Sequence, residues 1–194
     1  MTTVQVQRSS ATSLDLALVA AFAALIAVCS ILPAVNVSTF APITLQTFGV
    51  LLAGAVLGAR RGATAVLLWI AVGAAGLPVF ANGRSGLPVL AGPTGGYIIG
   101  MVAGAAIIGL VAEALARRDR ASQPLALFLG GVIAVAVVHA AGVVGLHLRA
   151  DLGWLAAAAV DGAFWIGDVI KLLATVVVAA AVHRAFPWLL RGRG

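Results

Sequence analysis

Charged side chains are scarce in this chain: only 9% of its 194 residues are Asp, Glu, Lys or Arg, whereas 62% are hydrophobic and the mean hydropathy is +1.14. A soluble domain carries about a quarter charged residues. The composition therefore excludes a soluble protein, and no soluble module is left once the apolar segments are assigned. We expect an all-α integral membrane protein with a single domain over residues 1–194.

Cysteine, lysine and metal-binding motifs are scarce as well. Cys29 is the only cysteine, which excludes an internal disulfide and a cysteine-based metal cluster. Lys171 is the only lysine and has no preceding glycine, so a Walker A motif is missing and any ATP hydrolysis must come from another polypeptide. The histidines His139, His147 and His183 are far apart and have no carboxylate at metal-ligand spacing. We expect no metal, no cofactor and no catalytic residue.

Hydropathy predicts six membrane-spanning helices, because a span needs about 20 apolar residues, or fewer where protein covers the helix. They cover Leu14–Val35, Leu45–Ala59, Ala63–Pro78, Gly95–Ala116, Leu125–Leu146 and Leu155–Val182. The second and third are short and are joined by Arg60-Arg61-Gly62, which predicts a tight antiparallel helix hairpin. The first is followed by a weak cleavage site, so we expect a retained span.

The cations separate when successive loops are assigned alternately to the two sides of the membrane. With the N-terminus inside, the cytoplasmic side receives Arg8, Arg60, Arg61, Arg117, Arg118, Arg120, Arg184, Arg191 and Arg193. The outer side receives only Arg84 and Arg149, and Lys171 lies within the membrane. This positive-inside pattern predicts a multi-pass protein with both termini in the cytoplasm. The net charge of +6 then points to the anionic headgroups of the lipid bilayer as a partner, and no nucleic acid is expected.

Arg84 is the cation that needs an explanation, because it stands on the outer side. It lies in the connection Leu77–Thr94, where three prolines and three glycines argue against a continuous helix. Val79, Phe80 and Leu87 are too apolar for a loop in water. We expect a re-entrant or lid-like segment over the outer mouth of the helix bundle, because irregular backbone at membrane depth must be covered by protein or line a cavity.

Glycines recur at four-residue spacing in two series. The series are Gly92, Gly96, Gly100, Gly104 and Gly54, Gly58, Gly62. Such spacing lets helix backbones approach closely. Tight packing inside the chain is the favoured interpretation, and a groove that admits a flat ligand is the alternative.

Two other features each allow two interpretations. The first span carries small residues that include Ala17, Ala21 and Ala24. Alanine is common in this chain, so composition alone favours a chance occurrence of these small residues. The alternative is a smooth helix face that docks another membrane protein. Gln46, at the start of the second span, either satisfies neighbouring backbone groups or points its amide into a cavity, where it both donates and accepts.

Asp168 and Lys171 are two charges inside the last apolar segment. Their i, i+3 spacing places them on one helix face, and each costs about 2.5–3.5 kcal/mol near the bilayer centre. A private salt bridge is a weak explanation, because desolvation can outweigh the attraction. Asp161 lies one heptad earlier, on roughly the same face. The row of Asp161, Asp168 and Lys171 therefore favours the polar lining of a cavity over a packing device.

Four segments in this order resemble the BioY family, the biotin-binding S component of energy-coupling factor (ECF) transporters. They are Ala41–Gly54, Gly73–Ala81, Gly92–Gly100 and Gly167–Lys171. The similarity covers nearly the whole chain, although the first dozen residues and residues 117–161 contribute little to it.

The resemblance implies a six-helix protein of the bacterial inner membrane with biotin bound near the outer face. It also implies a transmembrane coupling protein and ABC-type ATPase subunits as partners, with Ala17, Ala21 and Ala24 docking the coupling protein. Whether the chain also forms a homo-oligomer is left open. The family's Gly-Asp-x-x-Lys motif matches this chain at Gly167. The expected substrate-binding residues are Asp168, Lys171, Arg84, Asn82, Gln46, Tyr97, Gly95, Gly96, Phe80 and Asp161.

The chemistry of biotin agrees with the three charged residues. The Asp168 carboxylate can accept the ureido N–H groups, and Lys171 can donate to the ureido oxygen. The planar guanidinium of Arg84 suits a carboxylate tail. Two alternatives stay open, namely an S component for another vitamin and a self-sufficient, ion-coupled secondary carrier with Asp168 as its proton site. An intramembrane enzyme comes last, because the chain has no nucleophile–base constellation.

Overall fold

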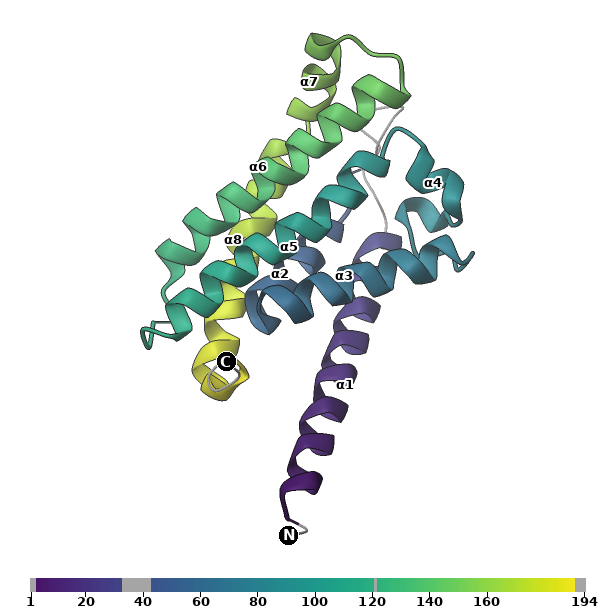
Figure 1. The fold of residues 1–194 in the computed structure, drawn as a ribbon. Helices are drawn as coiled ribbons and strands as arrows, with labels where there is room; N and C mark the ends of the chain where they lie inside the picture. The colour runs from purple at the N-terminus through teal and green to yellow at the C-terminus, as the bar shows by residue number, and fades with distance from the viewer. Residues whose placement is uncertain (1–2, 33–42, 121, 191–194) are drawn as a thin grey trace.

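The structure is a computed structural model that describes residues 3–32, 43–120 and 122–190, with side chains from residue 13 onward in the first helix. Its elements are helices throughout the described chain (Figure 1). The longer helices are α1 (Thr3–Ile31), α2 (Gln46–Leu57), α3 (Ala59–Ala74), α5 (Gly95–Ala116), α6 (Pro124–Arg149) and α8 (Trp165–Ala185). The shorter ones are η1 (Ala81–Gly83), α4 (Leu87–Ala91), α7 (Trp154–Gly162) and η2 (Pro187–Leu189).

Four segments are long and apolar enough to cross a membrane. They are Ser13–Ile31, Gly95–Ala116, Pro124–Arg149 and Trp165–Ala185. Helix α2 is apolar but shorter. These segments and the helical elements confirm the expected class of an all-α membrane protein. The predicted end of the first span at Val35 lies outside the described residues, as do Arg191, Arg193 and the first two residues of the segment Ala41–Gly54.

The sixth predicted span, Leu155–Val182, is wrong as a single helix, because the chain breaks between α7 and α8. The amides of Ala163 and Phe164 donate to carbonyls only three residues back, on Val160 (3.4 Å) and Asp161 (2.9 Å). This tightens the backbone and ends α7. The segment is apolar on both sides of the break, so hydropathy alone does not locate it.

Helices α5 and α6 pack closely through glycine. A Cβ atom at Gly96 would collide with the Ala141 carbonyl of α6, and one at Gly100 would lie 2.8 Å from the Ala141 Cβ. A Cβ atom at Gly104 would lie 2.7 Å from Val138 Cγ2. The packing interpretation of this series is therefore confirmed within α5, whereas Gly92 lies before the helix begins.

The turn between α2 and α3 lies at Gly58 and not at the predicted Arg60-Arg61-Gly62, which forms the first turn of α3. Gly58 has φ +85°, a conformation that favours glycine. Beside it, the Glu113 carboxylate of α5 accepts a hydrogen bond from the Ala59 amide at 2.8 Å. A side-chain acceptor at the start of a helix satisfies an amide that has no partner within the helix.

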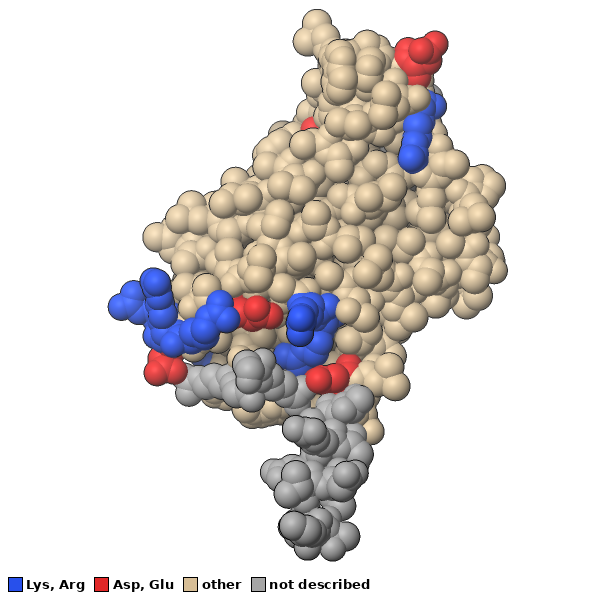
Figure 2. Space-filling view, viewed as in Figure 1, with Lys and Arg blue, Asp and Glu red and all other residues tan. Residues whose placement is uncertain are grey.

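Charged side chains gather at the two ends of the face in Figure 2, and a wide band without charge separates them. The Glu113–Ala59 contact joins the start of α3 to the last turn of α5. Arg61 donates to Asp15 Oδ1 of α1 (3.2 Å) and to the Leu189 carbonyl of η2 (2.7 Å). We call this the basic end, defined by Arg60, Arg61, Arg117, Arg118 and Arg120. Arg149 lies at the opposite end of α6 from these arginines, and the side of the membrane that each end faces stays a prediction.

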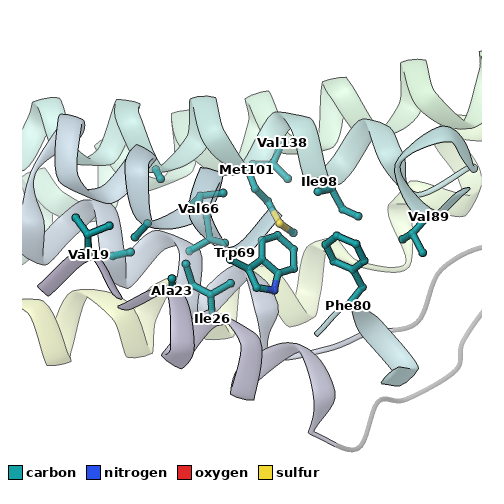
Figure 3. Close-up of a cluster of buried hydrophobic side chains, with 14 residues drawn as sticks. Val19, Ala23, Ile26, Val66, Trp69, Phe80, Val89, Ile98, Met101 and Val138 are labelled. Carbon is teal, nitrogen blue, oxygen red and sulfur yellow. The ribbon is translucent and has the colours of Figure 1, made fainter. Parts of the chain in front are cut away.

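The connection between α3 and α5 is irregular and packs onto the bundle, as expected. Phe80 is 1% exposed and meets Trp69 of α3 edge to face, with ring centroids 5.2 Å apart. The Trp69 indole N–H donates to the Val79 carbonyl at 3.0 Å, and the Gly86 amide donates to the Gly73 carbonyl at 2.8 Å. Figure 3 shows Phe80 among side chains from α3, α4, α5 and α6. The connection is therefore part of the core.

Candidate ligand-binding site

A cavity that is partly open to the surroundings lies between α2, α5, α6, α8 and the connection that precedes α5. One wall is the end of the hydrophobic core and consists of Phe80, Val89, Ile98, Met101 and Val138. The polar lining consists of Thr44, Gln46, Thr47, Arg84, Thr94, Tyr97, Asp168 and Lys171. Ligand sites for small molecules are typically concave and mostly apolar, with a few polar groups.

The cavity lies away from the basic end. Gln46 begins α2 and Asp168 lies in the first turn of α8, whereas both helices end near the basic end. Tyr97 likewise lies in the first turn of α5. Apart from Arg84, the polar lining therefore lies at or near the starts of three helices.

Asp168 and Lys171 form a buried ion pair in the cavity wall. Lys171 Nζ donates to Asp168 Oδ1 at 2.7 Å. The side chains of Asp168 and Lys171 are 7% and 10% exposed. The predicted meeting of the two charges on one face of α8 is present in the structure. Together they offer a bound molecule an acceptor and a donor side by side.

His139 of α6 is the participant that the sequence reasoning missed. Its Nε2 lies 3.1 Å from Asp168 Oδ2, and its Nδ1 lies 2.7 Å from Asp161 Oδ1. A titratable side chain within an apolar span is a functional candidate by default. That signal was present in the sequence, although His139 has no carboxylate at metal-ligand spacing. No group able to hold a metal ion is found in the described part of the chain.

Asp161 does not line the cavity but lies behind it. Its Oδ1 also accepts from the Tyr97 hydroxyl at 2.8 Å, and its Oδ2 accepts from the Trp165 indole N–H at 2.9 Å. The Trp165 ring stacks on His139 with centroids 4.5 Å apart. Asp161 thus joins side chains from α5, α6 and α8.

Arg84 and Gln46 line the cavity, as do Phe80 and Tyr97. The Arg84 side chain is exposed, and its Nε donates to the Ala81 carbonyl at 3.4 Å. This contact does not use the two terminal nitrogens of the guanidinium group. Gln46 is buried, and its Oε1 lies 3.4 Å from the Thr44 hydroxyl. A guanidinium is suited to an anionic group.

Besides Asp161, three further predicted site residues lie outside the lining. Asn82 is exposed in η1 with φ 58°. Gly95 packs against the Leu90 carbonyl and Arg149, whose guanidinium donates to the same carbonyl. Gly96 packs against α6. The two glycines therefore shape the start of α5, and the structure does not bring them to the cavity.

The arrangement suits a small molecule with three parts. An apolar portion would contact the wall of core residues. A group with both N–H donors and a carbonyl would meet the Asp168–Lys171 pair, and an anionic tail would meet Arg84.

Comparison with known proteins gives a consistent result. The profile of the BioY family matches residues 3–188. Biotin transporter BioY of Rhizobium etli is 40% identical over 179 residues, which are 90% of this chain and 96% of that protein. Biotin transporter BioY of Rhodobacter capsulatus is 40% identical over 191 residues, which are 93% of this chain and 98% of that protein. A crystal structure of the S-component for biotin from an ECF-type ABC transporter matches with a TM-score of 0.83 and 26% identity, covering 95% of each chain.

These matches extend over nearly the whole chain and over nearly the whole of the proteins that it resembles. The resemblance drawn from the four sequence segments is confirmed. The chain belongs to the BioY family.

Proposed function

We propose that this protein takes up biotin as the substrate-binding S component of an ECF-type transporter and performs no catalysis itself. The observation that carries the proposal is the partly apolar cavity with the buried Asp168–Lys171 pair in its wall. Relatives that carry the name biotin transporter, and a similar structure described as an S-component for biotin, support the choice of ligand.

The chemistry of biotin fits the three parts of the cavity. Its ureido ring has two N–H donors and one carbonyl acceptor, which match the Asp168 carboxylate and the Lys171 ammonium. Its thioether ring and aliphatic chain suit the wall that includes Phe80, together with the ring of Tyr97, which also lines the cavity. Its carboxylate suits Arg84, and Gln46 supplies a further polar contact.

The connection between α3 and α5 acts as the lid of the site in this proposal. Phe80, Ala81 and Arg84 already line the cavity, while Asn82 lies at the exposed turn beside them. A small movement of this segment would bring Asn82 closer to the ligand and close the opening. Capture outside is followed by this closure and then by inward release when the partner subunits hydrolyse ATP.

The proposed topology has six membrane-embedded helices, formed by α1, α2, α3, α5, α6 and the α7–α8 pair within a single domain. The basic end faces the cytoplasm together with both termini, in the bacterial inner membrane. The cavity then opens toward the outer side.

The proposed partners are a transmembrane coupling protein and ABC-type ATPase subunits. Ala17, Ala21 and Ala24 are all exposed on α1, whereas Ala23 and Ile26 of the same helix are buried in the core. The small exposed face is therefore available for close helix packing. We propose it as the docking surface for the coupling protein.

Titration of the purified protein with biotin, thiamine and riboflavin tests the proposed function. We expect saturable, tight binding of biotin alone. Saturation by thiamine or riboflavin instead would make the protein an S component for another vitamin. Uptake of biotin into proteoliposomes driven by a proton gradient, without partner subunits, would favour the secondary carrier.

A further inference from the structure

Asp161 and His139 form a buried unit behind the cavity that contacts two cavity-lining groups at once. Tyr97 and Asp168 both line the cavity. The Tyr97 hydroxyl donates to Asp161, and Asp168 Oδ2 contacts His139. Neither Asp161 nor His139 lines the cavity itself. A ligand would therefore meet groups whose positions depend on a pair that it does not touch.

The contacts of this unit also extend across the break between α7 and α8, just before Asp168. Asp161 belongs to α7, and Trp165 and Asp168 belong to the first turn of α8. Asp161 accepts hydrogen bonds from Trp165 and Tyr97 and lies 2.7 Å from His139 Nδ1, so one carboxylate joins both sides of the break to α5 and α6. Buried carboxylates need such partners, because an unpaired charge in an apolar interior is very costly.

The contacts of His139 fit a charged form of the ring when both carboxylates are ionised. An ionised carboxylate only accepts hydrogen bonds, so His139 between two ionised carboxylates must donate from both ring nitrogens. That requires the imidazolium form. With Lys171 protonated as well, Asp161, Asp168, His139 and Lys171 then sum to zero charge. The Trp165 ring stacked at 4.5 Å is a favourable neighbour for a cationic imidazole.

We propose that His139, backed by Asp161, is a positioning residue for ligand binding: it holds the Asp168 carboxylate ionised and aimed into the cavity. The inference rests on the proposed function, since binding is its main readout. It assigns His139 a role through its Nε2 atom, which faces Asp168. The Nδ1 atom, which faces Asp161, holds the ring in place.

Two amide substitutions test the roles of the two ring nitrogens separately. The amide nitrogen of Gln can occupy the place of His Nε2, whereas that of Asn can occupy the place of His Nδ1. His139→Gln should keep a donor for Asp168 and reduce biotin affinity by about threefold or less. His139→Asn should leave Asp168 Oδ2 without its donor and reduce affinity roughly tenfold or more. Equal affinities for the two variants, or wild-type affinity for both, would overturn the proposal.

Asp161→Asn tests whether Asp161 holds the His139 ring in place. We expect it to weaken biotin binding roughly tenfold although its side chain lies outside the cavity lining. Asp151→Asn is the matched control, because Asp151 is exposed on the connection between α6 and α7 with φ 54°, which Asn also adopts. The control should bind like the wild type. Thermal unfolding of every variant shows whether the fold is retained.

A measurement without ligand distinguishes this inference from the proposed function. In protein labelled with ¹⁵N at histidine ring nitrogens, the signals of His139, assigned by their loss in His139→Gln, should show both nitrogens protonated at neutral pH. A neutral ring would overturn the proposal even if biotin binds. If wild-type protein fails to bind biotin, the proposed function fails. The same variants are then titrated with whichever of thiamine or riboflavin saturates, and the absence of any saturable ligand also overturns the positioning role.

Discussion

Phe80 meets Trp69 edge to face at 5.2 Å and thereby joins the connection before α5 to helix α3. Phe80 also lines the cavity, so one aromatic ring both anchors this segment and forms part of the cavity wall. A Cβ atom at Gly73 would collide with the Phe80 ring, which shows how closely the ring fits against α3. The Phe80 side chain therefore links the proposed lid to both α3 and the cavity.

Phe80→Ala should loosen the lid and speed the release of bound biotin. Truncation of a buried Phe typically costs about 3–5 kcal/mol in stability, and part of that loss falls on the closed lid. Release after dilution of the biotin complex is the measurement. Leu87→Ala is the control, because Leu87 lies in the same connection but is 66% exposed. Similar release rates for both variants would contradict the anchoring role.

Asp168→Asn and Lys171→Ala should each weaken biotin binding strongly while the protein still inserts into the membrane. Removal of one partner from a buried charged pair typically costs about 2–5 kcal/mol, which corresponds to roughly 30-fold or more in affinity. Titration with biotin is the measurement. The double variant Asp168→Asn/Lys171→Met removes both charges, so it should restore stability but not binding. Normal binding by both single variants would make the pair structural.

Arg84→Gln should weaken the binding of biotin by roughly tenfold but leave the binding of biotin amide nearly unchanged. The amide lacks the carboxylate that the guanidinium is proposed to pair with. Parallel titrations with the two molecules provide the test. Arg120→Gln, at the basic end, is the matched control and should leave both affinities unchanged. An equal loss for both ligands would place Arg84 away from the carboxylate.

Ala21→Leu should spare biotin binding and disrupt assembly with the coupling protein. The larger side chain would prevent close helix approach at the exposed face of α1. Copurification with coupling protein and ATPase subunits measures the effect. Leu16→Ala is a useful comparison, because Leu16 is 69% exposed on the same helix and its truncation adds no bulk. If the Ala21 variant assembles normally, the alanines on this face reflect only the composition of the chain.

Gly96→Ala should destabilise the protein by about 1–3 kcal/mol, because an added methyl group overpacks the α5–α6 contact. Thermal unfolding in detergent measures the change. Gly162→Ala is the matched helical control, since a Cβ atom there meets nothing within 4 Å. It should be neutral or slightly stabilising. Equal unfolding temperatures would contradict the packing role of Gly96.

Local features of the chain explain why much of this protein could be predicted. Hydropathy located α5 at its observed bounds and α6 nearly so, because each is a long apolar run with polar ends. The spacing of Asp168 and Lys171 placed them in contact because both lie on one helix, where three residues make almost one turn. The prolines and glycines of the connection before α5 predicted irregular backbone for the same local reason.

Other features depend on contacts between distant residues. The turn at Gly58 is favoured by Glu113, which is 54 residues away from Ala59. The break between α7 and α8 lies in an apolar segment whose hydropathy does not change. Its position follows from helix packing, and hydropathy measures only partition into lipid.

The sequence by itself determined the membrane class, the placement of cations at the two ends and the local Asp168–Lys171 pair. Only the tertiary structure decided that His139 joins this pair and that Asp161 stands behind the cavity instead of lining it. His139 is separated by 22 residues from Asp161 and by 29 from Asp168, so their contact exists only once α6, α7 and α8 pack together. Residue spacing along one helix predicts its shared face, but it carries no information about which neighbouring helix supplies the next charge.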